Sequence, residues 1–147
     1  VLRDRIGDGR VMAEQVRFEL VSPEKLVLET HAALVTVPGA EGEFGVLPGH
    51  MPAVSALRPG LVDICETSDS QVDRRIFVPG GFAEVNADRL TILAEAAIDP
   101  EEVDPAQLAQ DIRDVEDDLE DSPEMHERER LEARLTWMRT LQDIVTA

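Results

Sequence analysis

The sequence predicts a chain of two parts, an antiparallel β-sandwich or barrel followed by an antiparallel hairpin of two helices. Up to residue 98, short apolar or alternating runs are separated by turn residues every 8–12 positions, a spacing typical of all-β domains. After Asp99-Pro100 the apolar residues recur at three or four positions, which indicates helices. We therefore expect residues 1–15 to be an N-terminal extension, 16–98 the sandwich and 99–147 the helical hairpin.

The first expected strand has the clearest pattern. Val16, Phe18 and Leu20 alternate with polar residues, which indicates a strand with one buried face. Further short runs rich in valine, leucine and isoleucine, each ended by a turn, extend the prediction to Leu93. These expected strands are 26–29, 32–37, 54–57, 61–65, 75–78, 82–85 and 90–93.

The stretch Pro38–Pro52, here called the ridge, holds three prolines and four glycines in fifteen positions. Such density excludes a helix interior and predicts a shaped turn-and-loop segment between strands. Glu41, Glu43 and His50 place two carboxylates and one imidazole on it. Loops on a rigid scaffold often carry binding and catalytic groups. Acid/base catalysis by Glu43 and His50 is one interpretation, but an open ridge favours a contact surface.

The second part begins with a helix-capping signal. Asp104 is a suitable N-cap and Pro105 suits the first helical position, and Ser122-Pro123 repeats the signal for a second helix. We expect the two narrow apolar stripes to pack mainly against each other, leaving the hairpin either detachable from the sandwich or permanently docked. The stripes are Leu108, Ile112, Val115, Leu119 and then Leu131, Leu135, Met138, Leu141, Val145.

Two further expectations concern the second helix. Arg128 stands four residues from Glu124 and from Glu132, a spacing that favours ion pairs on one helix face. Trp137 is expected to be a packing residue, with an interface role as the alternative.

The composition limits the partners. The 147 residues carry a net charge of −17, which argues against nucleic-acid binding and against direct adsorption to an anionic membrane. Residues 99–147 hold 16 acidic residues against five arginines, either as a solvated helix face or as an arm for a basic partner. Cys65 is alone, so an internal disulfide is excluded and a reducing compartment fits. No apolar run reaches the roughly 18 residues expected of a spanning helix, so no direct membrane insertion is expected.

The first residues do not resemble a secretory signal. Val1–Val11 is polar and contains glycine, without an apolar core. Met12 precedes the first strand, so we expect it to be the natural initiator after an extension; a short ordered arm is the alternative.

No pattern predicts catalysis, a metal site or a cofactor. A P-loop is absent, and the ridge glycines precede a strand rather than a helix that would bind phosphate. His31, His50 and His126 are scattered over three segments and lack metal-ligand spacing.

Two motifs make the chain resemble a known family. Glu41–Pro52 reads Glu-Gly-Glu-Phe-Gly-Val-Leu-Pro-Gly-His-Met-Pro and stands at a fitting distance from Arg58-Pro59-Gly60. Val78–Val85 reads Val-Pro-Gly-Gly-Phe-Ala-Glu-Val and is followed by Leu90–Ala94. Over residues 16–145 the chain resembles the epsilon subunit of the bacterial F-type ATP synthase.

This resemblance implies a sandwich of about ten strands in two sheets, followed by two helices. It implies a central-stalk subunit, at the cytoplasmic face of the bacterial inner membrane, that is bound to the gamma subunit and to the ring of c subunits. Such a subunit couples proton-driven rotation to ATP synthesis and has no active site of its own. Its hairpin can extend toward the alpha and beta subunits and restrain ATP hydrolysis.

The resemblance also implies site residues. Glu43, Phe44, Gly45 and His50 correspond to the loop that meets the c ring, where Glu43 offers a carboxylate to a basic loop and His50 a hydrogen bond. The ridge glycines allow the backbone to approach the ring closely.

ATP sensing by the hairpin is the alternative function. Some family members bind ATP through an Ile/Leu-Asp-x-x-Arg-Ala motif, and the corresponding run here is Val103–Leu108. Asp104 is present, but Gln107 replaces the arginine that would meet phosphate. The second helix has only four cations, which makes the restraint of hydrolysis secondary to coupling; they are Arg128, Arg130, Arg134 and Arg139.

Overall fold

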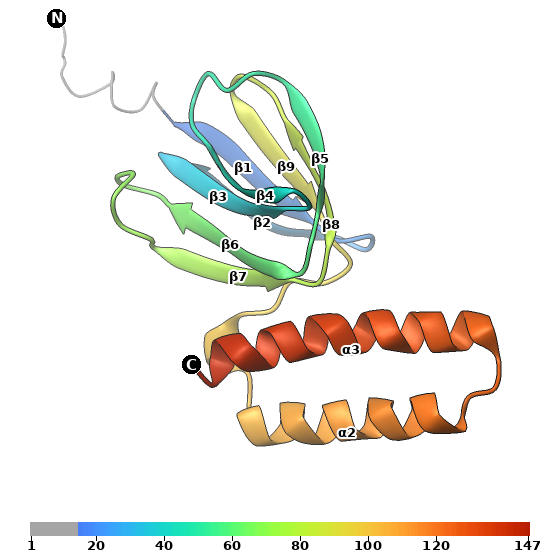
Figure 1. Ribbon diagram of the computed structural model, residues 1–147. Coiled ribbons are helices and arrows are strands. Elements are labelled where there is room, and N and C mark those ends of the chain that lie inside the picture. Colours follow the sequence, from blue (N-terminus) through green and yellow to red (C-terminus); the bar gives the residue numbers. More distant parts are fainter. Residues whose placement is uncertain (1–14) are drawn as a thin grey trace, which may run out of the picture.

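The computed structural model describes residues 15–147. Of the expected extension 1–15, residues 1–14, with Met12, lie outside the described residues. The described chain folds into nine strands and then into helices (Figure 1). The strands are β1 (Val16–Val21), β2 (Leu26–Ala32), β3 (Leu34–Gly39), β4 (Gly42–Val46), β5 (Ala53–Leu57), β6 (Gly60–Cys65), β7 (Arg74–Val78), β8 (Gly81–Val85) and β9 (Arg89–Leu93). The helices are the 3-10 turn η1 (Pro100–Glu102), α2 (Pro105–Asp121) and α3 (Met125–Val145).

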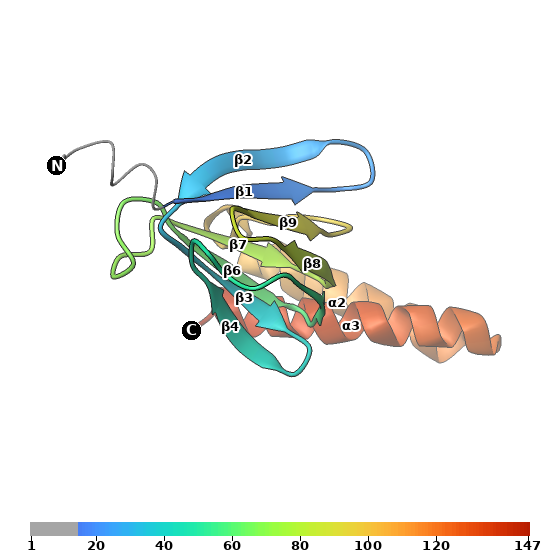
Figure 2. The ribbon, with the colours of Figure 1, turned by 90° about the horizontal axis from the view of Figure 1, so that it is seen from above.

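All nine described strands belong to one sheet that curls on itself. The hydrogen-bonded order is β2-β1-β9-β8-β5-β3-β6-β7, and β4 pairs with β3 outside this path. Figures 1 and 2 show two layers, β2-β1-β9-β8-β5 facing β4-β3-β6-β7. One register pair, Gly39 with Leu57, joins β3 to β5 at the corner between the layers. The predicted sandwich is confirmed.

Two features differ from the expected ten antiparallel strands. The described residues form nine strands, and a short bridge takes the place of a tenth, because Phe77 and Ile98 exchange backbone hydrogen bonds of 2.7 and 2.9 Å. In addition, β1 pairs with β9 in parallel, while the other pairs are antiparallel. A pairing between the first and last strands depends on contacts remote in sequence, which local patterns do not report.

The core lies on the inner face of the curled sheet. Val16, Phe18 and Leu20 are fully buried there, as the alternation in β1 predicts. Val35 of β3 and Ile64 of β6, in the other layer, belong to the same cluster, so the two layers share one apolar core. Burial of these side chains, at roughly 25 cal/mol per Å² of apolar surface, is the main source of stability.

The expectation that the ridge is entirely turn and loop was wrong. Pro38 and Gly39 end β3, and residues 42–46 form the strand β4, so only residues 40–41 and 47–52 are turn and loop. Pro38 fits a strand because its carbonyl still accepts, here from Arg58 N at 2.9 Å. Pairing with β3 overrides the weak strand propensity of the glycines.

The helices confirm the predicted first cap and correct the second. The Asp104 carboxylate accepts from Ala106 N at 3.0 Å and from Gln107 N at 3.5 Å. The helix α3 begins at Met125 instead of after Ser122, because the Glu124 carboxylate caps it through His126 N and Glu127 N at 2.9 and 3.0 Å. Ser122 is the C-cap of α2.

The expected ion pairs of Arg128 were wrong. Its guanidinium donates to Leu119 O at 2.7 Å and to Ser122 O at 3.1 Å. The last carbonyls of α2 lack helical partners. The Arg128 guanidinium therefore gains more by donating to them than by pairing with an exposed carboxylate. Ion pairs of the described helices include Arg130 with Glu127 and Arg139 with Glu116.

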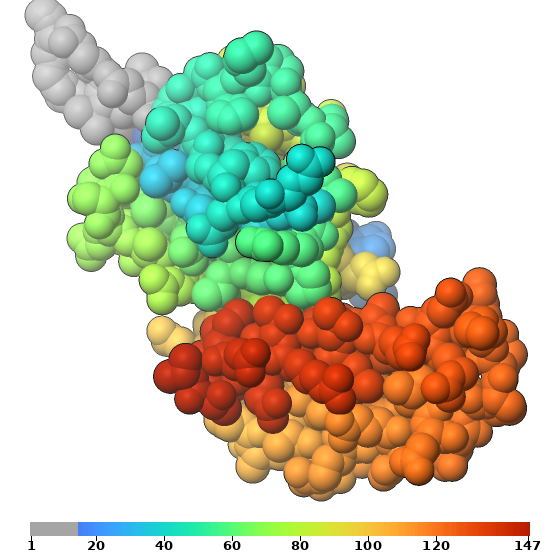
Figure 3. Space-filling view, viewed as in Figure 1, coloured from blue at the N-terminus to red at the C-terminus, as the bar shows by residue number. Residues whose placement is uncertain are grey.

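The hairpin holds together mainly through its own apolar stripes. Leu108, Ile112 and Val115 of α2 are buried against four residues of α3, as predicted. The fully buried Phe77 is the only strand residue among the buried members of this cluster, with Leu61 and Ile98 partly buried beside it. The Trp137 ring lies 6.2 Å from the Phe77 ring, which confirms a packing role. Figure 3 shows the hairpin as a lobe below the sheet that projects beyond it on one side.

A glycine at the start of β8 is required by packing as well as by backbone conformation. Gly81 has φ +137°, and a Cβ there would lie 2.0 Å from Leu93 O. Gly42 has a similar φ of +141° with no atom within 4 Å of an added Cβ. The pair therefore separates the backbone cost from the steric cost.

We expect Gly81→Ala to lower the free energy of unfolding by at least about 2 kcal/mol more than Gly42→Ala, which costs about 1–3 kcal/mol for the backbone alone. Urea unfolding of both variants measures the difference. Equal destabilisation by the two substitutions would contradict the packing argument.

Candidate functional site

The four residues expected to meet the c ring divide between two faces of β4. Phe44 is half-buried against the core, whereas Glu43 and Gly45 are exposed. Because side chains alternate along a strand, Glu43 and Phe44 project in opposite directions. His50 joins Phe44, with ring centroids 6.4 Å apart and planes tilted by 37°. The structure therefore brings Phe44 and His50 together and places Glu43 on the other side of the strand.

The loop after β4 is held at both backbone and side-chain level. Gly49 N donates to Ala87 O in the β8–β9 turn at 2.7 Å, and His50 N donates to Leu47 O at 3.1 Å. Gly49 has φ +84°, a conformation that other residues rarely adopt. Figure 1 shows this loop at the end of the sheet that lies away from the helices. Hydrogen bonds therefore hold the loop backbone at His50 in place.

Apolar side chains surround this loop, and the sequence analysis missed them. Met51 is 79% exposed, Val54 is 74% exposed and Leu47 is 49% exposed. Exposed apolar side chains next to a half-buried imidazole are typical of a contact surface. The signal in the sequence was the apolar residues within a loop.

Glu43 stands in an unfavourable electrostatic position. Burial raises the pKa of Asp63 on β6 above its ordinary value; Arg75 opposes this effect and the Glu43 carboxylate adds to it. Arg75 Nε lies 3.4 Å from Asp63 Oδ1 without hydrogen-bond geometry. The like charge of Glu43 beside Asp63 does not help the fold, which favours a role for Glu43 in contact.

Asp104, the residue expected to bind nucleotide, acts as the cap of α2. Its carboxylate is engaged by two backbone N–H groups, and Gln107 donates to Asp111 Oδ1 at 2.8 Å. These interactions account for Asp104 structurally, and nucleotide binding stays a prediction.

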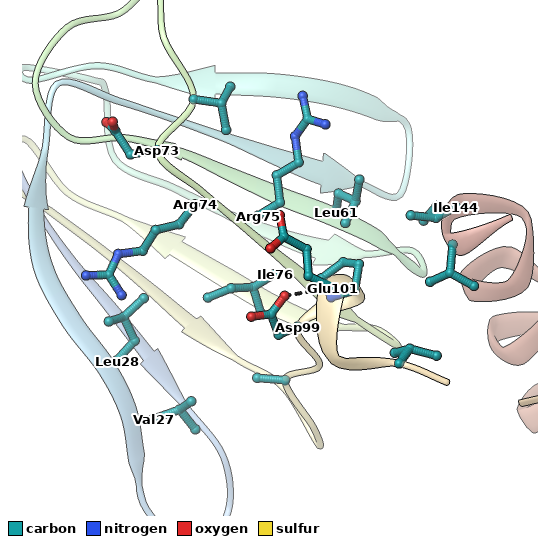
Figure 4. Close-up of a pocket in the computed structure, with 15 residues that line it drawn as sticks. Val27, Leu28, Leu61, Asp73, Arg74, Arg75, Ile76, Asp99, Glu101 and Ile144 are labelled. Atoms are coloured by element: carbon teal, nitrogen blue, oxygen red, sulfur yellow. Dashed lines mark hydrogen bonds between the residues drawn. The ribbon is translucent and has the colours of Figure 1, made fainter. Parts of the chain in front are cut away.

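A groove of about 1080 Å³ lies where the sheet edges β2 and β7 face each other (Figure 4). In Figure 4, Arg74 points across it toward Leu28, while Arg75 points away. Arg74 Nε donates to Glu66 at 3.2 Å, and the Asp99 carboxylate accepts from Glu101 N at 2.9 Å. The Arg74 and Asp99 side chains that line this groove are therefore engaged within the chain.

An apolar stripe crosses the outer face of the layer β2-β1-β9-β8-β5. Its members are cross-strand neighbours on five successive strands, in the register pairs Ala56–Phe82, Phe82–Leu93, Leu93–Val21 and Val21–Leu26. Phe82 is 57% exposed, Leu93 50% and Leu26 52%. Apolar side chains on the outward positions of strands are the signal by which the sequence analysis could have found this stripe.

The helix α3 runs along one side of the stripe. Together they bound a groove of about 1340 Å³, with Phe82 and Leu93 on the sheet and Arg134 and Trp137 on the helix. The groove is open to solvent and has an apolar sheet wall. A partner in it would contact the sandwich and the hairpin at once.

Comparisons with known proteins agree with this architecture. Residues 15–100 match the family described as ATP synthase, Delta/Epsilon chain, beta-sandwich domain, and residues 104–147 match the C-terminal domain of the ATP synthase epsilon chain. The protein belongs to the ATP synthase epsilon chain family. The epsilon chain of Rhodospirillum centenum is 46% identical over 92% of this chain and 95% of the relative. That of Maricaulis maris is 40% identical over 90% of this chain and 98% of the relative.

Solved structures of ATP synthase assemblies contain chains that share the fold. A chain of the Euglena gracilis mitochondrial ATP synthase, in a structure of OSCP, F1 and c-ring, superposes with a TM-score of 0.73 and 29% identity. The alignment covers 99% of this chain and 89% of that one. A chain of the Tetrahymena thermophila central stalk and c-ring has a TM-score of 0.67 at 19% identity, over 88% of this chain and 96% of that one.

Two other features are missing from the described part of this epsilon family member. None of its described helices is long and apolar enough to cross a bilayer. Within residues 15–147, no group of three or more histidine, cysteine, aspartate or glutamate side chains is arranged to hold a metal ion.

We expect Glu43→Gln to lower the pKa of Asp63 toward its ordinary value, because a like charge is removed. A raised carboxyl pKa means that the folded chain holds this proton more tightly, so stability falls as pH rises through the titration of Asp63. The variant should therefore be more stable than the parent above that titration and converge with it in acid. Carboxyl NMR titration and unfolding at several pH values measure both effects.

Glu41→Gln is the matched control, since Glu41 is exposed in the adjacent turn and is not among the groups acting on Asp63. An equal shift of the Asp63 pKa in both variants would contradict the assignment to Glu43.

Proposed function

We propose that this protein is a non-catalytic central-stalk subunit that couples rotation of the c ring to ATP synthesis through gamma. The observation that carries the proposal is the presence of two separate exposed contact surfaces on one sheet. The apolar stripe lies on the outer face of one layer, and the ridge lies on the other layer. A coupling element needs a rigid body between its two attachments, and a shared core joins these layers.

The stripe fits the gamma subunit. Three large apolar side chains of the stripe are half-exposed, namely Phe82, Leu93 and Leu26. Exposing them to water costs free energy and gives a monomeric protein no benefit. A contiguous apolar surface with an aromatic anchor is typical of a stable protein interface. Relatives of this fold are solved within assemblies that contain F1 and a c-ring, which supports a stalk partner for this surface.

The ridge fits the polar loops of the c ring. Glu43 supplies a carboxylate for a basic loop, and His50 with Phe44 supplies an imidazole beside an aromatic ring. Gly45 is exposed and lets the backbone come close. The protein then lies peripherally, at the cytoplasmic face of the membrane, held there by the ring.

We expect Glu43→Ala combined with His50→Ala to lower proton-coupled ATP synthesis in assembled membranes, while the catalytic head still hydrolyses ATP. Glu24→Ala combined with His31→Ala is the control, since both residues are exposed away from the ridge. Synthesis and ATP-driven proton uptake are the measurements. Undiminished coupling in the ridge variant would argue against the ring contact.

We expect Phe82→Glu to weaken binding to gamma by about tenfold or more, because it puts a charge in the apolar stripe at the position of its aromatic residue. Met125→Glu is the control, because Met125 is also a large exposed apolar residue but lies at the start of α3. Affinity for purified gamma is measured for both. Equal loss in the two variants would remove the stripe from the interface.

Restraint of ATP hydrolysis by the hairpin is a second candidate function. The hairpin contains its own apolar cluster, and its buried contact with the strands is centred on Phe77. A hairpin with this packing can leave the sheet without losing its internal contacts.

We expect a protein ending at Ile98 to raise ATP hydrolysis by the assembled complex, because the restraint is removed. Trp137→Ala, which weakens docking at Phe77 without removing the hairpin, should instead lower hydrolysis by favouring the extended state. Steady-state hydrolysis and synthesis are compared in membranes. An unchanged rate of ATP hydrolysis in the truncated complex would show that the hairpin does not restrain hydrolysis.

A further inference from the structure

His50 makes one side-chain hydrogen bond, and chemistry sets its direction. Nδ1 lies 2.7 Å from Met51 O, which can only accept, so Nδ1 carries the proton. Turning the ring over would put a carbon atom 2.7 Å from Met51 O. This is too short, because the carbon and oxygen of a C–H···O contact lie about 3.3–3.6 Å apart. In the neutral imidazole, the other nitrogen, Nε2, therefore keeps its lone pair.

The Nε2 atom of His50 is open to solvent. No described residue hydrogen-bonds to it. It is not buried, because Asp63 Oδ1 is the only side-chain nitrogen or oxygen in the described chain that is both buried and without a partner. His50 itself is half-buried. An accessible nitrogen on a half-buried ring is a directed hydrogen-bonding group.

Four contacts fix the direction in which Nε2 points. The backbone of the loop is held by Gly49 N to Ala87 O at 2.7 Å and by His50 N to Leu47 O at 3.1 Å. The Phe44 ring, at 6.4 Å, stands beside the imidazole. With Nδ1 bound to Met51 O, the ring has little freedom to exchange its two nitrogens.

We propose that His50 acts as a hydrogen-bond acceptor through Nε2, so that the c-ring loop opposite it must present a donor. The proposal rests on the proposed function, in which the ridge meets the ring. Glu43, the other polar contact group, also only accepts when ionised. Each of the two groups is therefore selective for arginine, lysine, amide or backbone N–H groups, and it disfavours a carboxylate or carbonyl, which would leave acceptors facing each other.

The tautomer can be tested without the complex. In the ¹⁵N-labelled full-length protein, above the pH range in which imidazole titrates, two-bond ¹H–¹⁵N correlation spectra distinguish the two neutral forms. We expect His50 to be protonated at Nδ1, whereas the exposed His31 is an internal reference that favours protonation at Nε2. His50→Gln assigns the signal. Protonation of His50 at Nε2 would overturn the proposal.

The direction of the ring contact is tested in assembled membranes. His50→Gln retains an acceptor oxygen, whereas His50→Lys offers only donors. We expect the Gln variant to keep about tenfold more coupled synthesis than the Lys variant, with His31→Gln and His31→Lys as matched controls. Equal loss in both His50 variants would overturn the acceptor assignment alone. Full coupling in both would overturn the ring contact at His50, and with it this part of the proposed function.

Discussion

The curled sheet depends on one constraint, which is that successive side chains of a strand point to opposite faces and one of these faces lines the core. Phe18 and Ile92 point inward and are fully buried, so their neighbours in the chain must point outward. A slip of one residue in register would exchange the two sets. The core therefore dictates which residues the outer face presents, but it makes no demand on their polarity. Phe82 and Leu93 stand at such outward positions, where the core does not require apolar residues, and the proposed contact with gamma accounts for them.

The hairpin follows a different rule, because its two helices satisfy each other. Their stripes bury seven residues between them, and the sheet adds Phe77. Arg128 of α3 binds the last carbonyls of α2, so even the polar end of the first helix is completed within the hairpin. A unit that is complete in itself can keep its structure in more than one position. This property is what a docked and an extended state both require.

The negative charge on the ridge disfavours the folded state. The protein already carries a charge of −17, and Glu43 adds a carboxylate close to Asp63, whose pKa is raised. His50 is held with its proton committed to Met51 O and its lone pair outward. Both groups offer acceptors, Glu43 from one face of β4 and His50 from the loop that follows this strand. Such an arrangement is favourable opposite a basic partner, as the proposed contact with the c ring requires.

Local patterns in the sequence were enough to determine the strand at Val16–Val21, the cap at Asp104 and the packing stripes of both helices, because those signals involve residues within a few positions of one another. The residues of the candidate ring site were identified through the family motif. The tertiary structure alone decided that residues 42–46 form a strand, that β1 pairs with β9 and that Glu43 and His50 leave β4 and its loop in different directions. It also assembled the apolar stripe from five strands. These features depend on pairing between residues far apart in the chain, and such pairing leaves no periodic trace in the sequence.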